Sequence, residues 1–179
     1  FFRLRDYLRA SVLFTDIVDN HRGHPAYPEA LFLLGESLFQ AGDFLGARTR
    51  FREIVDQSGA RAYQPFVQRS LGRAIEIAIR TQNFDGVEAL FSRMSQLPPT
   101  EIEAGTNYFR AKYLFGRAVP HTDAVTPGQL TPEAVNLSVL EESRVAFDLV
   151  AAASPYYGQA RYFIGVIHTI REEYPQALA

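Results

Sequence analysis

The feature that most constrains this chain is an internal repetition at a fixed offset of 37 residues. Residues 6–10 (DYLRA) recur as residues 43–47 (DFLGA), and the two copies stay in step as far as Asp19 and Asp56. Two further copies begin near Asn83 and near Tyr174. They match fewer residues, but their aromatic and alanine or valine residues stand at the corresponding positions of the repeat. Self-similarity at a period of this size is typical of repeat proteins, in which one small unit recurs and neighbouring units share a core.

A second pattern precedes each copy. Leu31-x-x-Leu34-Gly35-x-x-Leu38 stands before the second copy, and shorter forms of it begin at Leu71-Gly72 and at Ile164-Gly165. The combination of Leu-Gly-x-x-Leu, an aromatic residue, Ala-x-x-x-Phe and a proline near the unit's end resembles the tetratricopeptide repeat family. The resemblance extends over nearly the whole chain except residues around 117–131 and implies an all-α fold. The expected architecture is a right-handed superhelical α-solenoid of antiparallel helix hairpins.

The recurring small residues have a physical explanation in such a hairpin. Glycine inside a helix costs about 1 kcal/mol relative to alanine, so its recurrence at one phase needs a packing reason. Close approach of the first helix to the second supplies that reason, and the phenylalanines would fill the space between hairpins. The residues predicted to make this packing are Ala10, Phe14, Gly35, Ala47, Phe51, Gly72, Phe91, Phe147, Gly165 and Ala177.

The repeat phase predicts a single array over residues 1–179. It contains a half repeat at 1–24, repeats at 25–60, 61–99 and 100–156, and a partial repeat at 157–179. Nine helices are expected, among them 2–20, 27–40, 43–57, 62–80, 83–96, about 100–117 and one from 131–133 to about 153. Since the chain opens and closes inside expected helices, we expect it to be a fragment of a longer repeat protein.

The expected helix starts carry side chains suited to capping. Asp43 and Asn83 stand where a side-chain oxygen can accept the free N–H groups of a first turn. Thr100 and Glu103 have the spacing of a capping box, and residues 131–133 (TPE) have similar chemistry. Residues 118–130 form an inserted loop where the first unit has a tight turn. That insertion is either a partner contact or a tolerated elongation.

Composition argues against several function classes. The net charge is −2 with both signs interspersed, whereas a nucleic-acid face needs a concentrated basic patch. There is no cysteine, so disulfides and thiolate metal sites are impossible. No apolar run approaches the roughly 20 residues of a membrane-spanning helix. The basic residues are nearly all arginine, with Lys112 the only lysine, as a GC-rich bacterial genome would produce.

Candidate catalytic chemistry is sparse. Four histidines are present, but their spacing does not suit three or four convergent metal ligands, and His168 takes a packing position equivalent to Leu38. The adjacent acids Glu141 and Glu142 point in different directions on a helix. The sequence shows no phosphate-binding loop and no nucleophile motif. We therefore expect a non-enzymatic protein without a metal or cofactor.

The remaining candidate is a binding surface. In tetratricopeptide arrays the first helix of each hairpin lines a concave groove that binds extended peptides or helices. The resemblance places in this protein-binding groove Glu29, Phe32, Glu36, Phe39, Gln40, Phe66, Arg69, Arg73, Glu76, Tyr108, Lys112, Tyr162 and Val166. The family's carboxylate clamp for chaperone tails is not reproduced. Arg69 and Arg73 are expected to contact the partner without contributing to stability.

The leading hypothesis is a protein–protein interaction scaffold or adaptor, in a cell-envelope or motility assembly. Alternatives are a regulatory or substrate-docking arm of a larger enzyme, and a repeat protein that self-associates through uncapped ends. The expected partner is another protein or peptide, with no nucleic acid and no direct membrane insertion. The compartment stays open between the cytoplasm and the cell envelope, including the periplasm.

Overall fold

The described residues of this computed structural model are 1–97, 105–119 and 135–178, and they form helices without a strand. The chain divides into two compact units, Phe1–Ile102 and Glu103–Ala179, which we describe separately. The described helices are η1 (Phe2–Leu4), α1 (Tyr7–Asn20), α2 (Tyr27–Gln40), α3 (Phe44–Asp56), α4 (Gln64–Thr81), α5 (Val87–Ser95), α6 (Thr106–Ala118), α7 (Leu137–Asp148), α8 (Tyr157–Ile170) and α9 (Tyr174–Ala177). The all-helical fold predicted from the sequence is confirmed over these residues.

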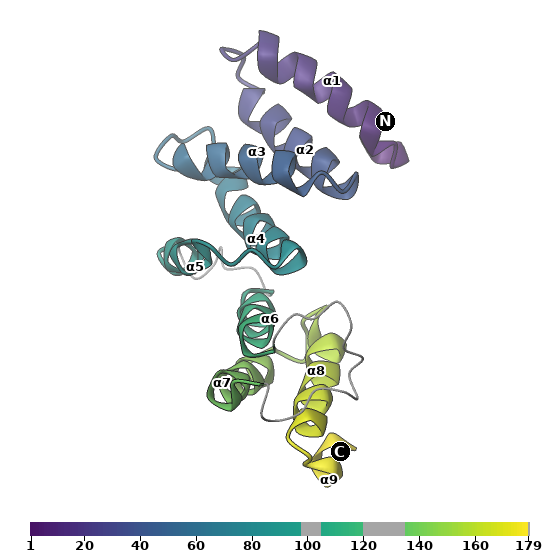
Figure 1. Cartoon of the computed structure of the whole chain (residues 1–179). Coiled ribbons are helices and arrows are strands. Elements are labelled where there is room, and N and C mark those ends of the chain that lie inside the picture. Colours follow the sequence, from purple (N-terminus) through teal and green to yellow (C-terminus); the bar gives the residue numbers. More distant parts are fainter. Residues whose placement is uncertain (98–104, 120–134, 179) are drawn as a thin grey trace. The chain divides into compact units, whose positions relative to one another are not determined.

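In the first unit, successive helices pack against one another as antiparallel neighbours. Helix α2 lies against both α1 and α3, α3 packs on α4, and α4 packs on α5 (Figure 1). Helix α2 also touches α4, so helices that are one 37-residue step apart in the sequence are in contact. The interior of this unit is apolar, and the largest fully buried side chains include Phe32, Phe51 and Ile75.

The first turns of α1 and α3 show why the repeat begins with aspartate. Asp6 accepts a hydrogen bond from the Arg9 N–H at 3.3 Å, and Asp43 accepts one from the Gly46 N–H at 2.9 Å. The predicted cap at Asp43 is confirmed. The first helix was expected to start at Phe2, but a separate 3-10 turn covers residues 2–4 and α1 begins only after the cap at Asp6.

The predicted cap at Asn83 is wrong. The Asn83 side chain accepts a hydrogen bond from the Asp85 N–H at 3.2 Å, which forms a local turn. Gly86 then adopts a φ of +78°, a left-handed conformation that favours glycine, and α5 starts at Val87. The helix is consequently shorter than the predicted 83–96 segment.

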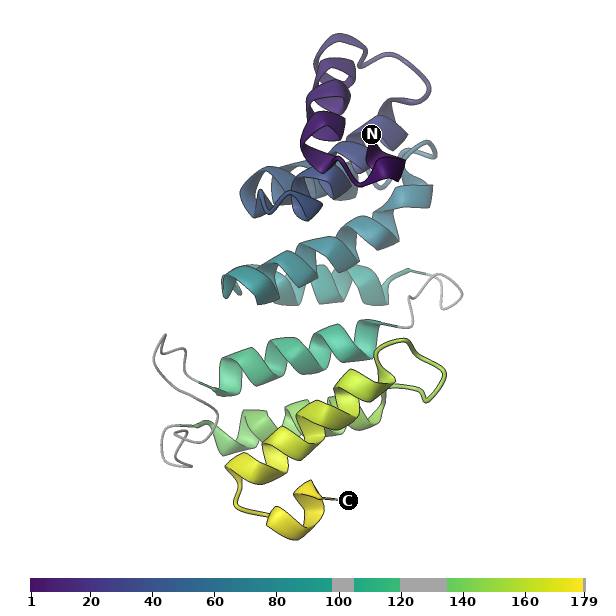
Figure 2. The same ribbon diagram turned by 90° about the vertical axis from the view of Figure 1, so that its right-hand side faces the viewer.

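In the second unit, α7 packs against both α6 and α8, and the chain turns back from the end of α8 into the short α9 (Figure 2). Helix α7 begins at Leu137 because the Asn136 side chain accepts the Val139 N–H at 3.2 Å. It ends at Asp148, earlier than the predicted end near Ala153. The capping residues suggested at 100–103 and 131–133 lie outside the described residues, as does most of the predicted 118–130 insertion, although Ala118 still belongs to α6.

The turn between α2 and α3 and the turn between α8 and α9 have the same geometry although their sequences differ. The Asp43 N–H donates to the Leu38 carbonyl at 2.9 Å, and the Glu173 N–H donates to the His168 carbonyl at 2.8 Å. The residue before each donor is left-handed, Gly42 with φ +86° and Glu172 with φ +61°. Only the first turn therefore uses the glycine that this conformation favours.

The predicted packing positions are mostly interior. Seven of them are buried: Ala10, Gly35, Ala47, Phe51, Gly72, Phe91 and Phe147. Phe14, Gly165 and Ala177 are half-buried, and Phe14 is covered on one side by the Phe2 ring at a centroid distance of 6.4 Å. The close approach predicted at Gly35 is present, since a Cβ placed there would stand 2.8 Å from Cε1 of Phe51.

Candidate functional site

The predicted groove positions of α2 and α4 meet in pairs that are one repeat apart. The Arg69 guanidinium carbon stands 4.3 Å from the centroid of the Phe32 ring, and Arg73 binds Glu36. Both pairs join residues separated by 37 positions, which are equivalent places in successive repeats. The repeat phase therefore identified residues that lie side by side on one face of the first unit.

Glu36 and Arg73 form a two-pronged ion pair between these helices. Arg73 Nε donates to Glu36 Oε1 at 2.7 Å and Nη2 donates to Oε2 at 3.0 Å. The third guanidinium nitrogen, Nη1, donates to Glu76 at 2.7 Å, and Arg80 binds the other oxygen of Glu76 at 2.8 Å. The result is a chain of four alternating charges that begins on α2 and runs along α4.

The ion pair between Glu36 and Arg73 is largely shielded from water. The Glu36 side chain is only 8% exposed and the Arg73 side chain is 31% exposed. Burial alone would lower the pKa of Arg73, but the hydrogen bonds to Glu36 and Glu76 outweigh it and raise the pKa, so the guanidinium stays charged. The donors of Arg73 are occupied within the chain, which argues against the expectation that Arg73 contacts a partner without contributing to stability.

An aromatic layer lies beneath these charges. Phe32 and Phe39 are buried, and the Phe66 ring stacks on Phe32 with centroids 5.5 Å apart. The guanidinium groups of Arg73 and Arg80 stand over the Phe39 ring at 4.7 and 5.0 Å, within the range of cation–π attraction. These phenylalanines support the surface from below and offer little area of their own.

Three of the predicted groove residues in the first unit remain exposed: Glu29, Gln40 and Arg69. Among the described residues, the side chains of Glu29 and Gln40 have no hydrogen bond or ion pair. Arg69 makes the stacking contact on Phe32 but no ion pair with any described residue. The polar atoms of these three side chains are thus open to a ligand.

In the second unit, the predicted groove residues of α6 also pack onto α8 and the turn before it. The Tyr108 and Tyr156 rings stack with centroids 4.7 Å apart. The Lys112 ammonium stands 3.9 Å from the centroid of the Phe163 ring. Burial lowers the pKa of Lys112, since the charged form is disfavoured where water is excluded. Tyr108 and Lys112 are therefore largely occupied within this unit.

The outer side of α8 is more open. Tyr162 is 65% exposed, and with Val166, Thr169 and Ala177 it lines a shallow pocket of about 390 Å³ against α9. The predicted groove residues Tyr162 and Val166 thus contribute to a surface that the described chain leaves uncovered.

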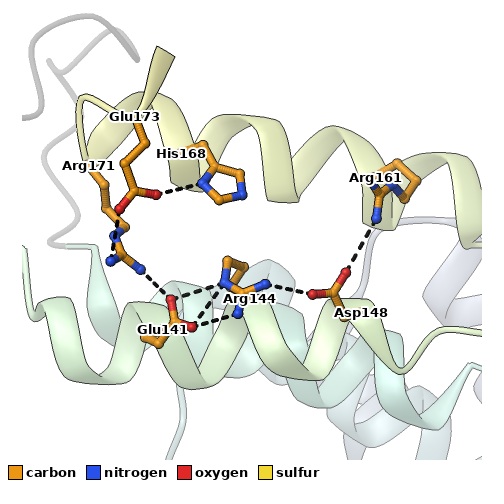
Figure 3. Close-up of polar contacts among 7 residues, drawn as sticks. All are labelled: Glu141, Arg144, Asp148, Arg161, His168, Arg171 and Glu173. Atoms are coloured by element: carbon orange, nitrogen blue, oxygen red, sulfur yellow. Dashed lines mark hydrogen bonds and ion pairs between the residues drawn. The ribbon is translucent and has the colours of Figure 1, made fainter. Parts of the chain in front are cut away.

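Arginine–carboxylate pairs also join α7 to α8 (Figure 3). Arg144 binds Glu141 at 2.7 Å and Asp148 at 2.6 Å, and Asp148 continues to Arg161 of α8 at 3.3 Å. Glu141 also binds Arg171 just after α8. The hydrogen bond from Arg144 is the main cause that lowers the pKa of Glu141, with both arginine charges adding to it. These groups tie the two helices together along most of their length.

The His168 side chain completes this arrangement. Its Nδ1 atom lies 2.7 Å from Glu173, which also binds Arg171 at 2.9 Å (Figure 3). The His168 side chain is 16% exposed, which agrees with the half-buried packing position predicted from the repeat phase. The contact holds the turn before α9.

Sequence reasoning missed one feature of the first unit. Helices α3, α4 and α5 enclose a pocket of about 420 Å³. Its lining includes the apolar residues Val55, Ala74 and Leu90 and the arginines Arg48 and Arg52. The signal was visible in the sequence as two arginines four residues apart on one helix face, but nothing in the repeat phase indicated that a pocket lies beside them.

The described ranges contain no group of three or more histidine, aspartate or glutamate side chains arranged to hold a metal ion. Within the same ranges, no helix combines the length and the apolar character that crossing a bilayer requires. The chain matches no family model, no curated protein and no solved structure. Functional conclusions therefore rest on the surfaces described above.

Proposed function

We propose that this chain is a protein-binding module, a tetratricopeptide-like α-solenoid that holds a segment of another protein on the face formed by α2 and α4. The observation that carries the proposal is the trio of exposed side chains on that face. Glu29, Gln40 and Arg69 present unpaired polar groups above buried aromatic rings. Binding surfaces of helical repeats commonly combine such polar groups with a rigid support.

The rigidity of the support favours this proposal. The Glu36–Arg73 pair and the Phe32–Phe66 stack fix α2 relative to α4 before any ligand arrives. A surface ordered in advance loses less conformational entropy on binding. An adaptor role, in a cell-envelope or motility assembly or elsewhere, needs such a surface and no catalytic group.

A site-specific photocrosslinker at Gln40 tests the proposal directly. We expect benzoylphenylalanine at this position, in the full-length protein in the cells that encode it, to capture one defined protein upon illumination. The matched control carries the crosslinker at Arg61, which is exposed, lies in the turn before α4 and is not one of the predicted groove residues. Capture should depend on position 40 and should fall when Arg69→Glu is introduced in the same chain.

The products also separate the alternatives. A product of twice the protein's mass would support self-association, and a product within one longer polypeptide would support a docking arm of an enzyme. The same set of bands from positions 40 and 61, or bands unaffected by Arg69→Glu, would refute binding through this face.

A further inference from the structure

The pocket between α3, α4 and α5 contains a half-buried cation that has neither an ion pair nor a ring contact among the described residues, whereas Arg69 on the α2–α4 face at least stacks on Phe32. Arg48 lines the pocket and is half-buried, yet among the described residues no carboxylate or ring engages its guanidinium. A half-buried guanidinium loses part of its hydration, which an ion pair or hydrogen bonds normally replace. The position is therefore prepared for an anionic group that the chain itself does not supply.

The surrounding charges leave the pocket electropositive. Arg93 binds Asp56 at 3.3 Å, and Arg52 lies 3.8 Å from the same carboxylate. One aspartate thus serves two arginines, and Arg48 adds a third positive charge. Asp85 is the second acid in the lining, so the arginines outnumber the acids by three to two.

The first copy of the repeat shows that packing does not require these arginines. Stepping back by 37 residues from Arg48 and Arg52 leads to Ser11 and Thr15 on α1. Those residues occupy the same helical phase with neutral side chains, and α1 still packs on α2. The cations on α3 are therefore specific to this pocket.

The apolar part of the pocket lining indicates that the ligand also carries an apolar side chain. Ala74 and Ala78 are four residues apart on α4, so their small side chains leave a hollow along one helix face. Val55, Val87 and Leu90 make its sides apolar. An apolar side chain would fill this hollow while a carboxylate reaches Arg48.

We infer that the pocket formed by α3, α4 and α5 binds an acidic segment of a partner protein, with Arg48 pairing with a carboxylate beside an apolar side chain. Arg52, with a side chain 82% exposed, keeps the edge open to solvent, as a continuing polypeptide requires. A polyphosphate or nucleic acid fits worse, because Asp56 and Asp85 would repel its closely spaced charges. This surface is separate from the α2–α4 face.

Selection from displayed random dodecapeptides on the purified protein tests this inference. Enriched peptides should share aspartate or glutamate next to leucine, isoleucine, valine or phenylalanine. For a synthetic copy of the best peptide, Arg48→Gln should weaken binding about tenfold, the usual worth of one charged hydrogen-bonded contact. Because Arg48 has no partner in the described chain, its loss should leave the melting temperature unchanged.

Two matched variants complete the experiment. Arg61→Gln removes an exposed arginine outside the pocket, and Arg69→Glu alters the α2–α4 face; neither should change the affinity for this peptide. A failure to enrich acidic peptides, or an affinity that Arg48→Gln leaves unchanged, would overturn the inference. Peptide binding lost equally with Arg69→Glu would assign the peptide to the α2–α4 face. That outcome would likewise overturn the pocket assignment and leave the proposed function standing.

Discussion

Both compact units join their helices through arginine–carboxylate pairs, but the two sets differ in exposure to water. In the first unit, the Glu36 side chain is 8% exposed and Arg73 grips both of its oxygens. In the second unit, Glu141 and Asp148 are 41% and 42% exposed, and each is shared by two arginines. Water screens the second set far more effectively, so similar geometry has a different energetic meaning in each unit.

The largest effect should come from removing Arg73. Arg73→Ala leaves the Glu36 carboxylate buried without its partner, and we expect a loss of about 2 to 3 kcal/mol of unfolding free energy. Arg144→Ala, the counterpart on α7, should cost less than about 1 kcal/mol because its partners remain hydrated. Urea denaturation followed by circular dichroism measures both. Adding Glu36→Leu to Arg73→Ala should restore part of the loss, and equal losses for the two single variants would contradict the comparison.

Glycines at equivalent repeat positions give the second contrast. A Cβ at Gly35 would stand 2.8 Å from Phe51, whereas one at Gly165 would reach only ordinary contact with the Ala177 carbonyl at 3.5 Å. Gly35→Ala should therefore destabilise the protein by about 1 to 2 kcal/mol through overpacking. Gly165→Ala should stabilise it by up to about 1 kcal/mol, since alanine favours the helix. Thermal melts of the two variants would be expected to shift in opposite directions.

Two buried serines provide a smaller contrast. Ser143 Oγ donates to the Ala111 carbonyl at 2.9 Å, joining α7 to α6, whereas Ser70 Oγ on α4 has no hydrogen-bond partner among the described residues. Ser143→Ala should cost about 1 kcal/mol, while Ser70→Ala should leave stability unchanged or raise it slightly. Chemical denaturation resolves such differences, and an equal loss at both positions would show that Ser70 is satisfied in solution.

Alkaline pH should act on the two units with opposite sign. Burial and the hydrogen bond to Glu53 raise the pKa of Tyr27 from 10 to about 12. The neutral Tyr27 hydroxyl therefore stabilises the folded protein fully below pH 10, and this stabilisation is lost as the pH rises toward 12. At pH 11 the loss is about 1 kcal/mol. Burial lowers the pKa of Lys112 below its usual 10.5, because holding the charged ammonium in the folded protein costs free energy. This destabilisation disappears as the pH rises from the lowered pKa toward 10.5.

Melting temperatures between about pH 8 and pH 11 separate these two contributions. Tyr27→Phe should flatten the decline seen in the parent protein. Lys112→Met should steepen it, because the compensating gain is removed. A decline that Tyr27→Phe does not change would mean that the Tyr27 hydroxyl ionises as freely in the folded protein as in the unfolded chain.

The sequence predicted the helical class, most helix positions and the packing role of Gly35, because these depend on local periodicity and side-chain size. It also placed Glu36 and Arg73 on the same face. It did not predict that they bind each other, since the phase gives the direction of a side chain but not its reach across to the next helix. Arg73 was consequently assigned to a partner when its donors are occupied within the chain.

The errors at helix starts have a similar origin. Asparagine is a common helix-capping residue, but its side chain can also accept a hydrogen bond from the backbone N–H two positions later, as Asn83 does here. Gly86 then adopts a left-handed conformation, and α5 begins only after it. The α3–α5 pocket was missed for a different reason. The pocket exists because Ala74 and Ala78 have small side chains that leave space unfilled. Small residues occur equally in tightly packed contacts, so the sequence alone did not indicate a pocket.

The contact between Glu36 and Arg73 has a consequence for how such a chain can arise by duplication. The two residues occupy equivalent positions in the repetition, separated by a single repeat length of 37 residues. A faithful duplicate would place glutamate beside glutamate or arginine beside arginine, and like charges at this distance repel. The contact could form only after the copies diverged. The ion pair therefore depends on a sequence difference between two positions that the 37-residue repetition makes equivalent.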